Sequence, residues 1–279
     1  MSSETNKSAV DEELHVIFGT GPVGLATATA LLKRGHRVRM VNRSGKAPAV
    51  VGTEVVATDA LNPTQAREAV KGARVVYGCA QPAYTRWPQD FPPLQRAILN
   101  ATADQGAKLV LADNLYMYGE VAGPIHEDLP YAARTRKGKV RAAMAKEALG
   151  AHQSGRVRVA IGRASDFYGP FVRESALGER VFGPLLQGKT AQLAGDLDQP
   201  HSYTFIDDFG EALAILGKRD EADGKAWHVP NAATRSTREV VTKAFELAGK
   251  TPKLNSVGRS MMRIGGIFIS GARETVEMM

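Results

Sequence analysis

Three glycines near the N-terminus have a spacing that could bind phosphate groups. Gly19, Gly21 and Gly24 form the pattern G-x-G-x-x-G, which follows an apolar run and precedes a helical pattern. The first glycine of such a turn permits a tight bend, the second leaves room for phosphates, and the third lets helix and strand pack closely. Since a helix N-terminus favours an anion, the sequence predicts a dinucleotide here, the alternative being an ordinary glycine-rich turn. The predicted phosphate-binding residues are Gly19, Thr20, Gly21, Pro22, Val23 and Gly24.

The residues after the next predicted strand bear on which dinucleotide would bind. That strand ends at Val41 and is followed by Asn42, Arg43 and Ser44. NAD-binding proteins usually carry a carboxylate here for the ribose 2′-hydroxyl, whereas a 2′-phosphate needs an arginine and no carboxylate. Arg43 can pair with a phosphate, with Asn42 and Ser44 as neutral donors. The sequence therefore predicts NADP, with NAD as the alternative; Arg43 could also be an ordinary surface residue.

Alternating strands and helices must position these residues. Near-continuous apolar strands separated by helical patterns indicate a parallel sheet that helices cover on both faces. We therefore expect an α/β protein with a Rossmann-type, doubly wound parallel sheet and a smaller C-terminal substrate-binding region. The predicted strands are 15–18, 37–41, 54–59, 74–79, 108–113 and 157–162, and the later predicted helices are 63–71, 92–105 and 136–151.

Three regions are predicted along the chain. Residues 1–13 are polar and form a disordered lead-in. Residues 14–170 form the dinucleotide-binding Rossmann domain. Residues 171–279 form mainly the substrate-binding region, from which some segments return to the Rossmann core.

Several segments, in chain order, resemble one family. Besides the glycine turn, they are Ala57–Leu61, Tyr77–Ala80, Asp113–Gly119, Arg163–Pro170 and His201–Asp208. Over nearly its whole length the chain resembles the extended or atypical short-chain dehydrogenase/reductases, the NAD-dependent epimerase/dehydratase group. The resemblance implies that Asp59 and Ala60 contact the adenine, although Asp59 could instead cap a helix. It also implies that the end of the fourth strand lines the cofactor with Cys79, Ala80 and Gln81.

The positions that resemble the family's catalytic residues depart from its pattern. Typical members use Ser or Thr together with Tyr-x-x-x-Lys, and we align Asn114 with the serine, Lys137 with the tyrosine and Arg141 with the lysine. Arg141 could donate to ribose hydroxyls but cannot act as a base. Lys137 could transfer a proton only if its pKa were depressed. Tyr116 is a further candidate proton donor, and Tyr84 could reach the same region.

Each of these residues also has a structural interpretation. Asn114 could simply cap the next turn. Lys137 and Arg141 could form a solvated basic helix face, or bind ribose or phosphate without transferring a proton. His201 takes a position at which the resemblance implies an arginine in sugar-nucleotide enzymes, which argues against a nucleoside-diphosphate-sugar substrate, although Arg173 or Arg235 could substitute for that arginine.

Composition bears on the partners, metals and cellular location that we expect for this protein. The chain has 279 residues and a net charge of +7 with scattered basic residues, so we expect a small-molecule substrate and no nucleic-acid partner. Cys79 is the only cysteine and the six histidines are far apart in sequence, so we expect no disulfide and no metal site. The single cysteine fits a reducing cytoplasm, where we expect a monomer or homodimer. Because no apolar run is long enough for a bilayer, we expect no membrane partner.

These features predict an NAD(P)-dependent oxidoreductase or epimerase-like enzyme, with NADP favoured, that acts on a small carbonyl or hydroxyl substrate. Its catalytic set would be atypical, with Asn114, Tyr116, Lys137 and Arg141 in place of Tyr-x-x-x-Lys. The departures also suit an alternative, a catalytically silent NADP-binding regulatory or scaffold protein.

Overall fold

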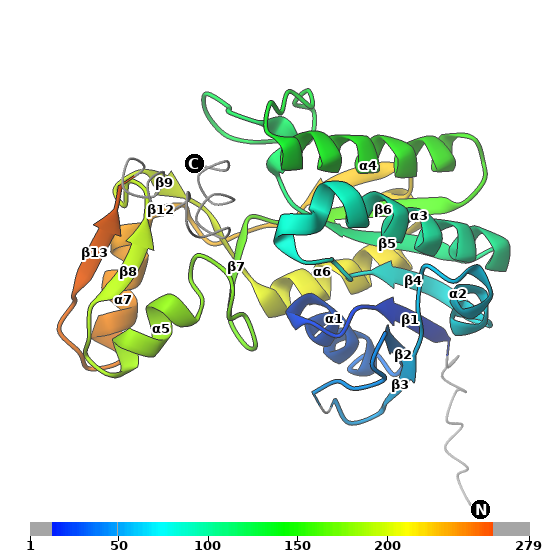
Figure 1. The fold of residues 1–279 in the computed structure, drawn as a ribbon, viewed down its shortest axis with the longest axis horizontal. Helices are drawn as coiled ribbons and strands as arrows, with labels where there is room; N and C mark the ends of the chain where they lie inside the picture. The colour runs from blue at the N-terminus through cyan, green and yellow to red at the C-terminus, as the bar shows by residue number, and fades with distance from the viewer. Residues whose placement is uncertain (1–12, 49, 259–279) are drawn as a thin grey trace, which may run out of the picture.

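A sheet of seven parallel strands forms the centre of the molecule (Figure 1). The computed structural model describes residues 13–48 and 50–258. The strand order is β11-β6-β5-β4-β1-β2-β3, so the chain starts inside the sheet and builds outward in both directions. The strands are β1 (Leu14–Phe18), β2 (Arg37–Asn42), β3 (Thr53–Ala57), β4 (Ala73–Gly78), β5 (Lys108–Asp113), β6 (Arg158–Arg163) and β11 (Lys225–His228).

Helices cover both faces of this sheet, which explains the near-continuous apolar strands. On β1, Val16 and Phe18 pack on one face and Ile17 on the other, and each strand side chain therefore enters one of two separate cores. The first core is closed by α2 (Pro63–Val70), α3 (Trp87–Gln105) and α4 (Arg136–Gln153), and the second by α1 (Pro22–Leu32) and α6 (Ile206–Lys218). The expected doubly wound α/β fold is confirmed.

Two elements differ from their sequence-based expectations. The strand β11 was missed because Lys225 and Trp227 are exposed at the sheet edge and break the apolar pattern. The helix α3 begins at Trp87 rather than at Pro92, because Pro92 lies in the second turn of the helix and not at its start. Its C-terminus agrees with the prediction, since Gly106 takes the left-handed conformation that ends many helices.

A smaller lobe faces the carboxyl ends of the central strands (Figure 1). It has its own apolar core, built around Val181, Leu193, Val241 and Phe245. The segment 206–229, with α6 and β11, returns to the central sheet between the two parts of this lobe. The elements between β6 and this segment are β7 (Asp166–Tyr168), α5 (Glu179–Leu186), β8 (Ala191–Ala194), β9 (Pro200–His201) and β10 (Tyr203–Phe205); those after it are β12 (Arg235–Ser236), α7 (Thr237–Leu247) and β13 (Leu254–Val257).

The ends of the chain lie partly outside the described residues. The predicted lead-in falls there except for Glu13, whose carbonyl oxygen accepts a hydrogen bond from the backbone N–H of Arg37 at 3.2 Å. The end of the predicted substrate-binding region, 259–279, also falls there. Among the helices that the structure describes, none combines the length and apolarity needed to cross a membrane.

Candidate cofactor site and active site

The glycine turn joins β1 to α1 in a shape that only glycine allows. Gly19 has a φ of 110°, in the region that disfavours other residues, and a Cβ there would lie 2.6 Å from the backbone nitrogen of Ala80. A Cβ on Gly24 would lie 2.0 Å from the carbonyl oxygen of Gly19. These two glycines therefore bring the turn against β4 and the helix against the strand.

Gly21 has a different environment from the other two glycines. A Cβ on Gly21 would meet no described atom within 4 Å, and Gly21 is the N-cap residue of α1. Pro22 follows as the first helical residue, and the first turn of α1 holds no acidic side chain and no side-chain cap bond to a described residue. The positive end of the helix dipole thus meets open space. This geometry fits a dinucleotide pyrophosphate.

The two kinds of glycine should respond differently to alanine. We expect Gly24→Ala to lower the free energy of unfolding by about 1–3 kcal/mol, because the packed turn must move. Gly21→Ala should cost about 1 kcal/mol or less, yet weaken the binding of a nicotinamide dinucleotide at least about tenfold, because its methyl group enters the phosphate space. Urea denaturation and fluorescence titration measure the two effects. Wild-type affinity in Gly21→Ala would show that phosphates do not lie at this turn.

Asn42 organises the loop after β2 instead of pointing a free amide at a ligand. Its Nδ2 donates to Thr20 Oγ1 at 2.7 Å and to the Lys46 carbonyl at 2.6 Å, which uses both amide hydrogens. Its Oδ1 accepts from the backbone N–H groups of Ser44 and Gly45. Asn42 therefore fixes the loop to the glycine turn, and both of its amide hydrogens are already bonded within the protein.

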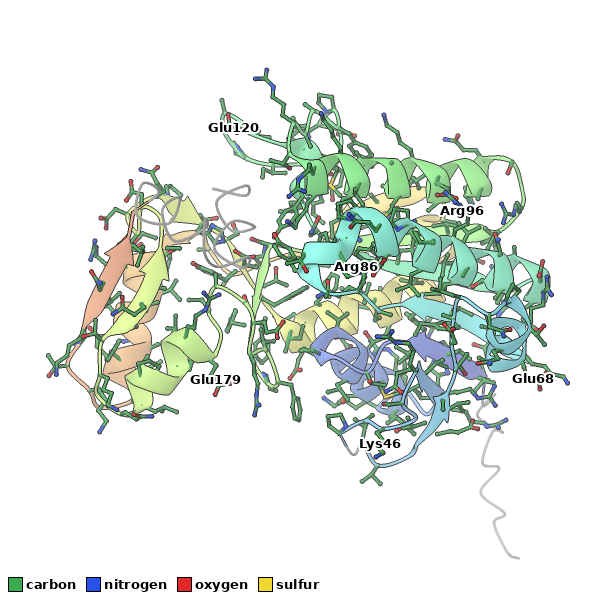
Figure 2. The ribbon with its side chains drawn as sticks, viewed as in Figure 1. Lys46, Glu68, Arg86, Arg96, Glu120 and Glu179 are labelled. Atoms are coloured by element: carbon green, nitrogen blue, oxygen red, sulfur yellow. The ribbon has the colours of Figure 1, made fainter. Side chains whose placement is uncertain are left out.

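The exposed neighbours in this loop are basic. Arg43, Ser44 and Lys46 are all exposed, and Lys46 extends from the lower edge of the molecule in Figure 2. Arg43 also contributes, after the larger effect of Arg86, to lowering the pKa of Asp90 at the start of α3. The loop thus presents two cations beside the turn that would hold the cofactor.

The remaining predicted cofactor residues follow β3 and β4. Asp59 is exposed, and its Oδ1 accepts from the backbone N–H of Leu61 at 3.0 Å, while Ala60 is buried. Burial raises the pKa of the Cys79 thiol to about 12, against the effect of a hydrogen bond with Thr27. The Cys79 thiol is therefore neutral at physiological pH. Ala80 lies against the glycine turn, and Gln81 is exposed beyond it.

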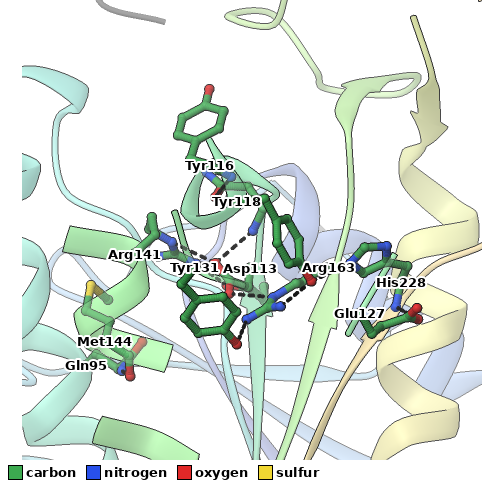
Figure 3. A network of polar contacts seen from close by, with 12 residues as sticks. Gln95, Asp113, Tyr116, Tyr118, Glu127, Tyr131, Arg141, Met144, Arg163 and His228 are labelled. Carbon is green, nitrogen blue, oxygen red and sulfur yellow. Dashed lines mark hydrogen bonds and ion pairs between the residues drawn. The ribbon is translucent and has the colours of Figure 1, made fainter. Parts of the chain in front are cut away.

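A buried ion network contains Arg141, one of the predicted catalytic residues (Figure 3). Arg141 donates through Nε to Asp113 Oδ1 at 2.7 Å, and one of its Nη atoms also bonds Asp113 and the Ala112 carbonyl. On the other side, Arg163 Nε lies 3.2 Å from Asp113 Oδ2. All three charged side chains are at most 4% exposed. Arg141 is thus held by a carboxylate, where the sequence suggested a bond to ribose.

The network continues from Arg163 toward the edge of the sheet (Figure 3). Arg163 donates to the hydroxyls of Tyr118 and Tyr131, and Tyr118 Oη lies 2.8 Å from His228 Nε2. Burial is the main cause that lowers the pKa of His228, although Glu127 acts in the opposite direction. The strand β11 therefore supplies a neutral imidazole to a network that begins on α4.

Lys137 lies in a second cluster, formed with two tyrosines. Its Nζ is 4.2 Å from the centre of the Tyr84 ring, and Tyr84 Oη lies 3.4 Å from Tyr116 Oη. Lys137 is only 1% exposed, so the expectation of a solvated basic face is wrong. Gly138 allows this approach of α4, because a Cβ there would lie 2.6 Å from the Tyr116 carbonyl oxygen.

The four predicted catalytic residues are therefore divided between two environments. Tyr116 and Lys137 meet at Tyr84, whereas Arg141 belongs to the Asp113 network. The Oδ1 of Asn114 accepts from the backbone N–H of Tyr116 at 3.1 Å, which is the turn-capping role. Figure 3 shows the Tyr116 ring pointing away from the Asp113 network. Burial and the charge of Asp166 raise the pKa of Tyr116, so its phenol stays protonated at neutral pH.

One polar pair was missed by the sequence analysis. His201 Nε2 lies 3.0 Å from Asp166 Oδ2, and both side chains are about 40% exposed. Asp166 acts electrostatically on Tyr116, so this pair borders the same region. The two residues are 35 positions apart. Only the pairing of β7 with β10 brings the two residues together, and no local sequence pattern predicts this contact.

The parallel sheet, the glycine turn at its carboxyl edge and the open helix N-terminus together define a dinucleotide-binding protein of the Rossmann class. Comparison with family models makes the assignment specific. The chain belongs to the NAD dependent epimerase/dehydratase family, whose model matches residues 16–229. No curated protein sequence matches the chain.

Solved structures share the fold at low sequence identity. The dTDP-glucose 4,6-dehydratase of Streptomyces venezuelae, solved with NAD and TYD bound, is 18% identical, with a TM-score of 0.76, 88% of this chain covered and 84% of that chain. The UDP-glucose 4-epimerase of Thermus thermophilus, in complex with NAD, is 21% identical, with a TM-score of 0.74 and coverages of 88% and 86%. The epimerase Mth375 of Methanothermobacter thermautotrophicus is 18% identical, with a TM-score of 0.78 and coverages of 90% and 81%.

Proposed function

We propose that this protein is an NADP-dependent oxidoreductase or epimerase-like enzyme for a small carbonyl or hydroxyl substrate. The proposal rests chiefly on one observation: a buried lysine and two phenols meet beside the carboxyl edge that carries the glycine turn. A nicotinamide dinucleotide bound at that turn would supply hydride transfer. The chain itself must orient the substrate oxygen and provide or accept its proton.

Tyr116 is the proposed proton donor of this site. Its phenol is neutral at physiological pH, since burial and Asp166 raise its pKa. The positive charge of Lys137, over the ring of Tyr84, favours negative charge that develops on the substrate oxygen. Asn114 and the Asp113 ion network hold the segment in place. The catalytic set is thus smaller than the sequence suggested, with two of its four members in supporting positions.

The pair of His201 and Asp166 bears on the substrate class. A nucleoside diphosphate is an anion, and a carboxylate beside the site opposes its binding electrostatically. In the structure His201 is engaged by Asp166, while the exposed Arg235 lies opposite His201 in the pairing of β9 with β12 and could supply a guanidinium to a diphosphate. Because the charge of Asp166 acts on Tyr116, we favour a small substrate without a diphosphate, in contrast to the UDP-glucose epimerase named above.

The experiment that tests catalysis is turnover with bound cofactor. Purified protein is loaded with NADPH and mixed with a panel of aldehydes, ketones and keto acids, and oxidation is followed by absorbance. We expect at least one substrate to give steady turnover that Lys137→Ala lowers. Arg96→Ala is the matched control, because Arg96 pairs with Glu147 on the outer surface.

The cofactor preference is tested through Arg43. We expect Arg43→Ala to weaken NADPH binding about ten- to a hundredfold, because a charged hydrogen bond contributes about 1.5–3 kcal/mol. NADH binding should remain within about twofold, because NADH has no 2′-phosphate. Calorimetric titration of both cofactors measures this difference. Equal losses for NADPH and NADH would contradict the assignment of Arg43.

A second candidate function is a catalytically silent NADP-binding regulator. The observation in its favour is that Arg141 and Asn114, at two of the family's catalytic positions, are engaged in structural contacts. This function predicts cofactor binding without turnover on any substrate of the panel, together with a partner that binds only one cofactor state. The same turnover experiment therefore separates the two proposals.

A further inference from the structure

Two histidines and a glutamate meet at the sheet edge opposite the cofactor site. Glu13 precedes β1, His15 lies within β1, and His36 immediately precedes β2. One ligand atom from each of the three residues lies within 4.8 Å of the others. The two imidazole rings are 4.2 Å apart between centres, and His15 Nε2 is 3.8 Å from Glu13 Oε2. Three strong metal-binding groups thus form one cluster.

Two nitrogen atoms in this cluster are buried without hydrogen bonds. They are His15 Nε2 and His36 Nδ1, neither of which has a hydrogen-bond partner among the described residues. Buried polar atoms in proteins are nearly always satisfied, and an exception suggests an ion or water that completes the site. His15 as a residue is 97% buried, since its exposed fraction is 3%.

Tyr77 holds the His15 ring in a ligating orientation. The phenol oxygen of Tyr77 lies 3.0 Å from His15 Nδ1, which leaves the other ring nitrogen on the side of Glu13, 3.8 Å from its Oε2. Metal-binding histidines in general have their second nitrogen fixed in this way. Tyr77 is itself fully buried on β4, and Gly217 of α6 makes room for it, because a Cβ there would lie 2.2 Å from Tyr77 Oη.

Although the histidines are far apart in sequence and predicted no metal site, the pairing of β1 with β2 brings two of them together, and we propose that Glu13, His15 and His36 bind a divalent transition-metal ion of the Zn²⁺ type. Two imidazoles and one carboxylate are an established zinc ligand set, with a water molecule as the fourth ligand. The site lies at the amino ends of β1 and β2, away from the glycine turn at the carboxyl ends. A bound ion would therefore link the amino ends of β1 and β2 and stabilise the fold, without taking part in the reaction.

Neighbouring cations decide which metals the site can hold. Arg74 Nε lies 3.3 Å from Glu13 Oε1, which leaves Oε2 directed at His15, and Arg34 and Lys218 act electrostatically on His36. The positive charges of these side chains oppose the binding of any cation. Hard ions such as Mg²⁺ prefer oxygen ligands and find only one carboxylate here, whereas transition metals gain strong bonds to imidazole. We therefore expect selectivity for Zn²⁺ and Co²⁺ over Mg²⁺ and Ca²⁺.

Metal titration of the full chain tests this site. The protein is treated with a chelator, and Zn²⁺ and Co²⁺ are added in calorimetric and absorbance titrations. We expect one equivalent to bind, a rise in the midpoint of thermal unfolding, and the visible bands of four-coordinate Co²⁺. His36→Gln and Glu13→Gln should each weaken binding at least about tenfold, because each removes one of the three ligands. His126→Gln, at an exposed histidine, is the matched control.

Other results would overturn the proposal. They are no binding of Zn²⁺ to the chelated protein, or equal binding to His36→Gln and the wild type. Because His36 and Glu13 are only partly buried, their variants should fold, and circular dichroism checks this.

Discussion

Replacing Asp113 with asparagine is expected to lower the free energy of unfolding by about 3–5 kcal/mol. The carboxylate of Asp113 lies between the guanidinium groups of Arg141 and Arg163, and all three side chains are at most 4% exposed. Without it, two buried cations would face each other with no compensating charge. Urea denaturation at neutral pH, followed by circular dichroism, measures the change.

Two further variants make this prediction specific. Asp104→Asn removes a carboxylate that pairs with Arg67 where both side chains are about half exposed, and should cost about 1 kcal/mol or less. Arg141→Met should cost less than Asp113→Asn, because Arg163 and Asp113 still form a pair. A loss for Asp113→Asn no greater than that for Asp104→Asn would mean that the ion network does not hold the site together.

Replacing Tyr116 with phenylalanine is expected to lower turnover by about 10²–10⁴-fold if Tyr116 supplies the proton, the range found for general acids and bases. The ring and its contact with Trp87, at 6.0 Å between centres, would remain. Only the hydroxyl is lost. Cofactor affinity should therefore stay within about twofold, since Tyr116 is not among the residues proposed to hold the dinucleotide.

The pH dependence of turnover gives a second measurement of the same role. Because burial and Asp166 raise the pKa of Tyr116, the phenol is protonated throughout the neutral range. Reduction of a carbonyl should then lose rate only at pH values above the usual range for tyrosine. Tyr203→Phe is the control, as it removes a phenol that bonds Thr237 at 2.7 Å. If Tyr116→Phe turns over as fast as this control, another group donates the proton.

Much of the cofactor half of the protein follows from the sequence. The spacing of Gly19, Gly21 and Gly24 is a local property, because glycine alone permits the positive φ of Gly19 and the close contact of Gly24 with Gly19. Near-continuous apolar strands likewise predict two covered faces of a parallel sheet, and the structure has them. Such features could be predicted because they depend on residues close together in the chain.

For the candidate catalytic site, the sequence predicted which residues belong to it but not which groups they contact. The sequence placed Lys137 and Arg141 four residues apart on one helix, but it could not tell which groups would face them. Tyr84 comes to Lys137 from the loop after β4, and Asp113 comes to Arg141 from the end of β5. Hence two neighbouring cations have different partners, one aromatic and one carboxylate.

The distance along the chain between interacting residues separates what the sequence alone determined from what the tertiary structure decided. Backbone conformation, helix starts and the apolar pattern depend on local sterics and on burial, so they can be recognised in the sequence. Charge pairing depends on contacts across the fold: Asp166 meets His201 only because β7 pairs with β10, and His15 meets His36 only because β1 pairs with β2. The sequence therefore determined the fold and the place for a dinucleotide, while the tertiary structure decided which side chains remain available for chemistry there.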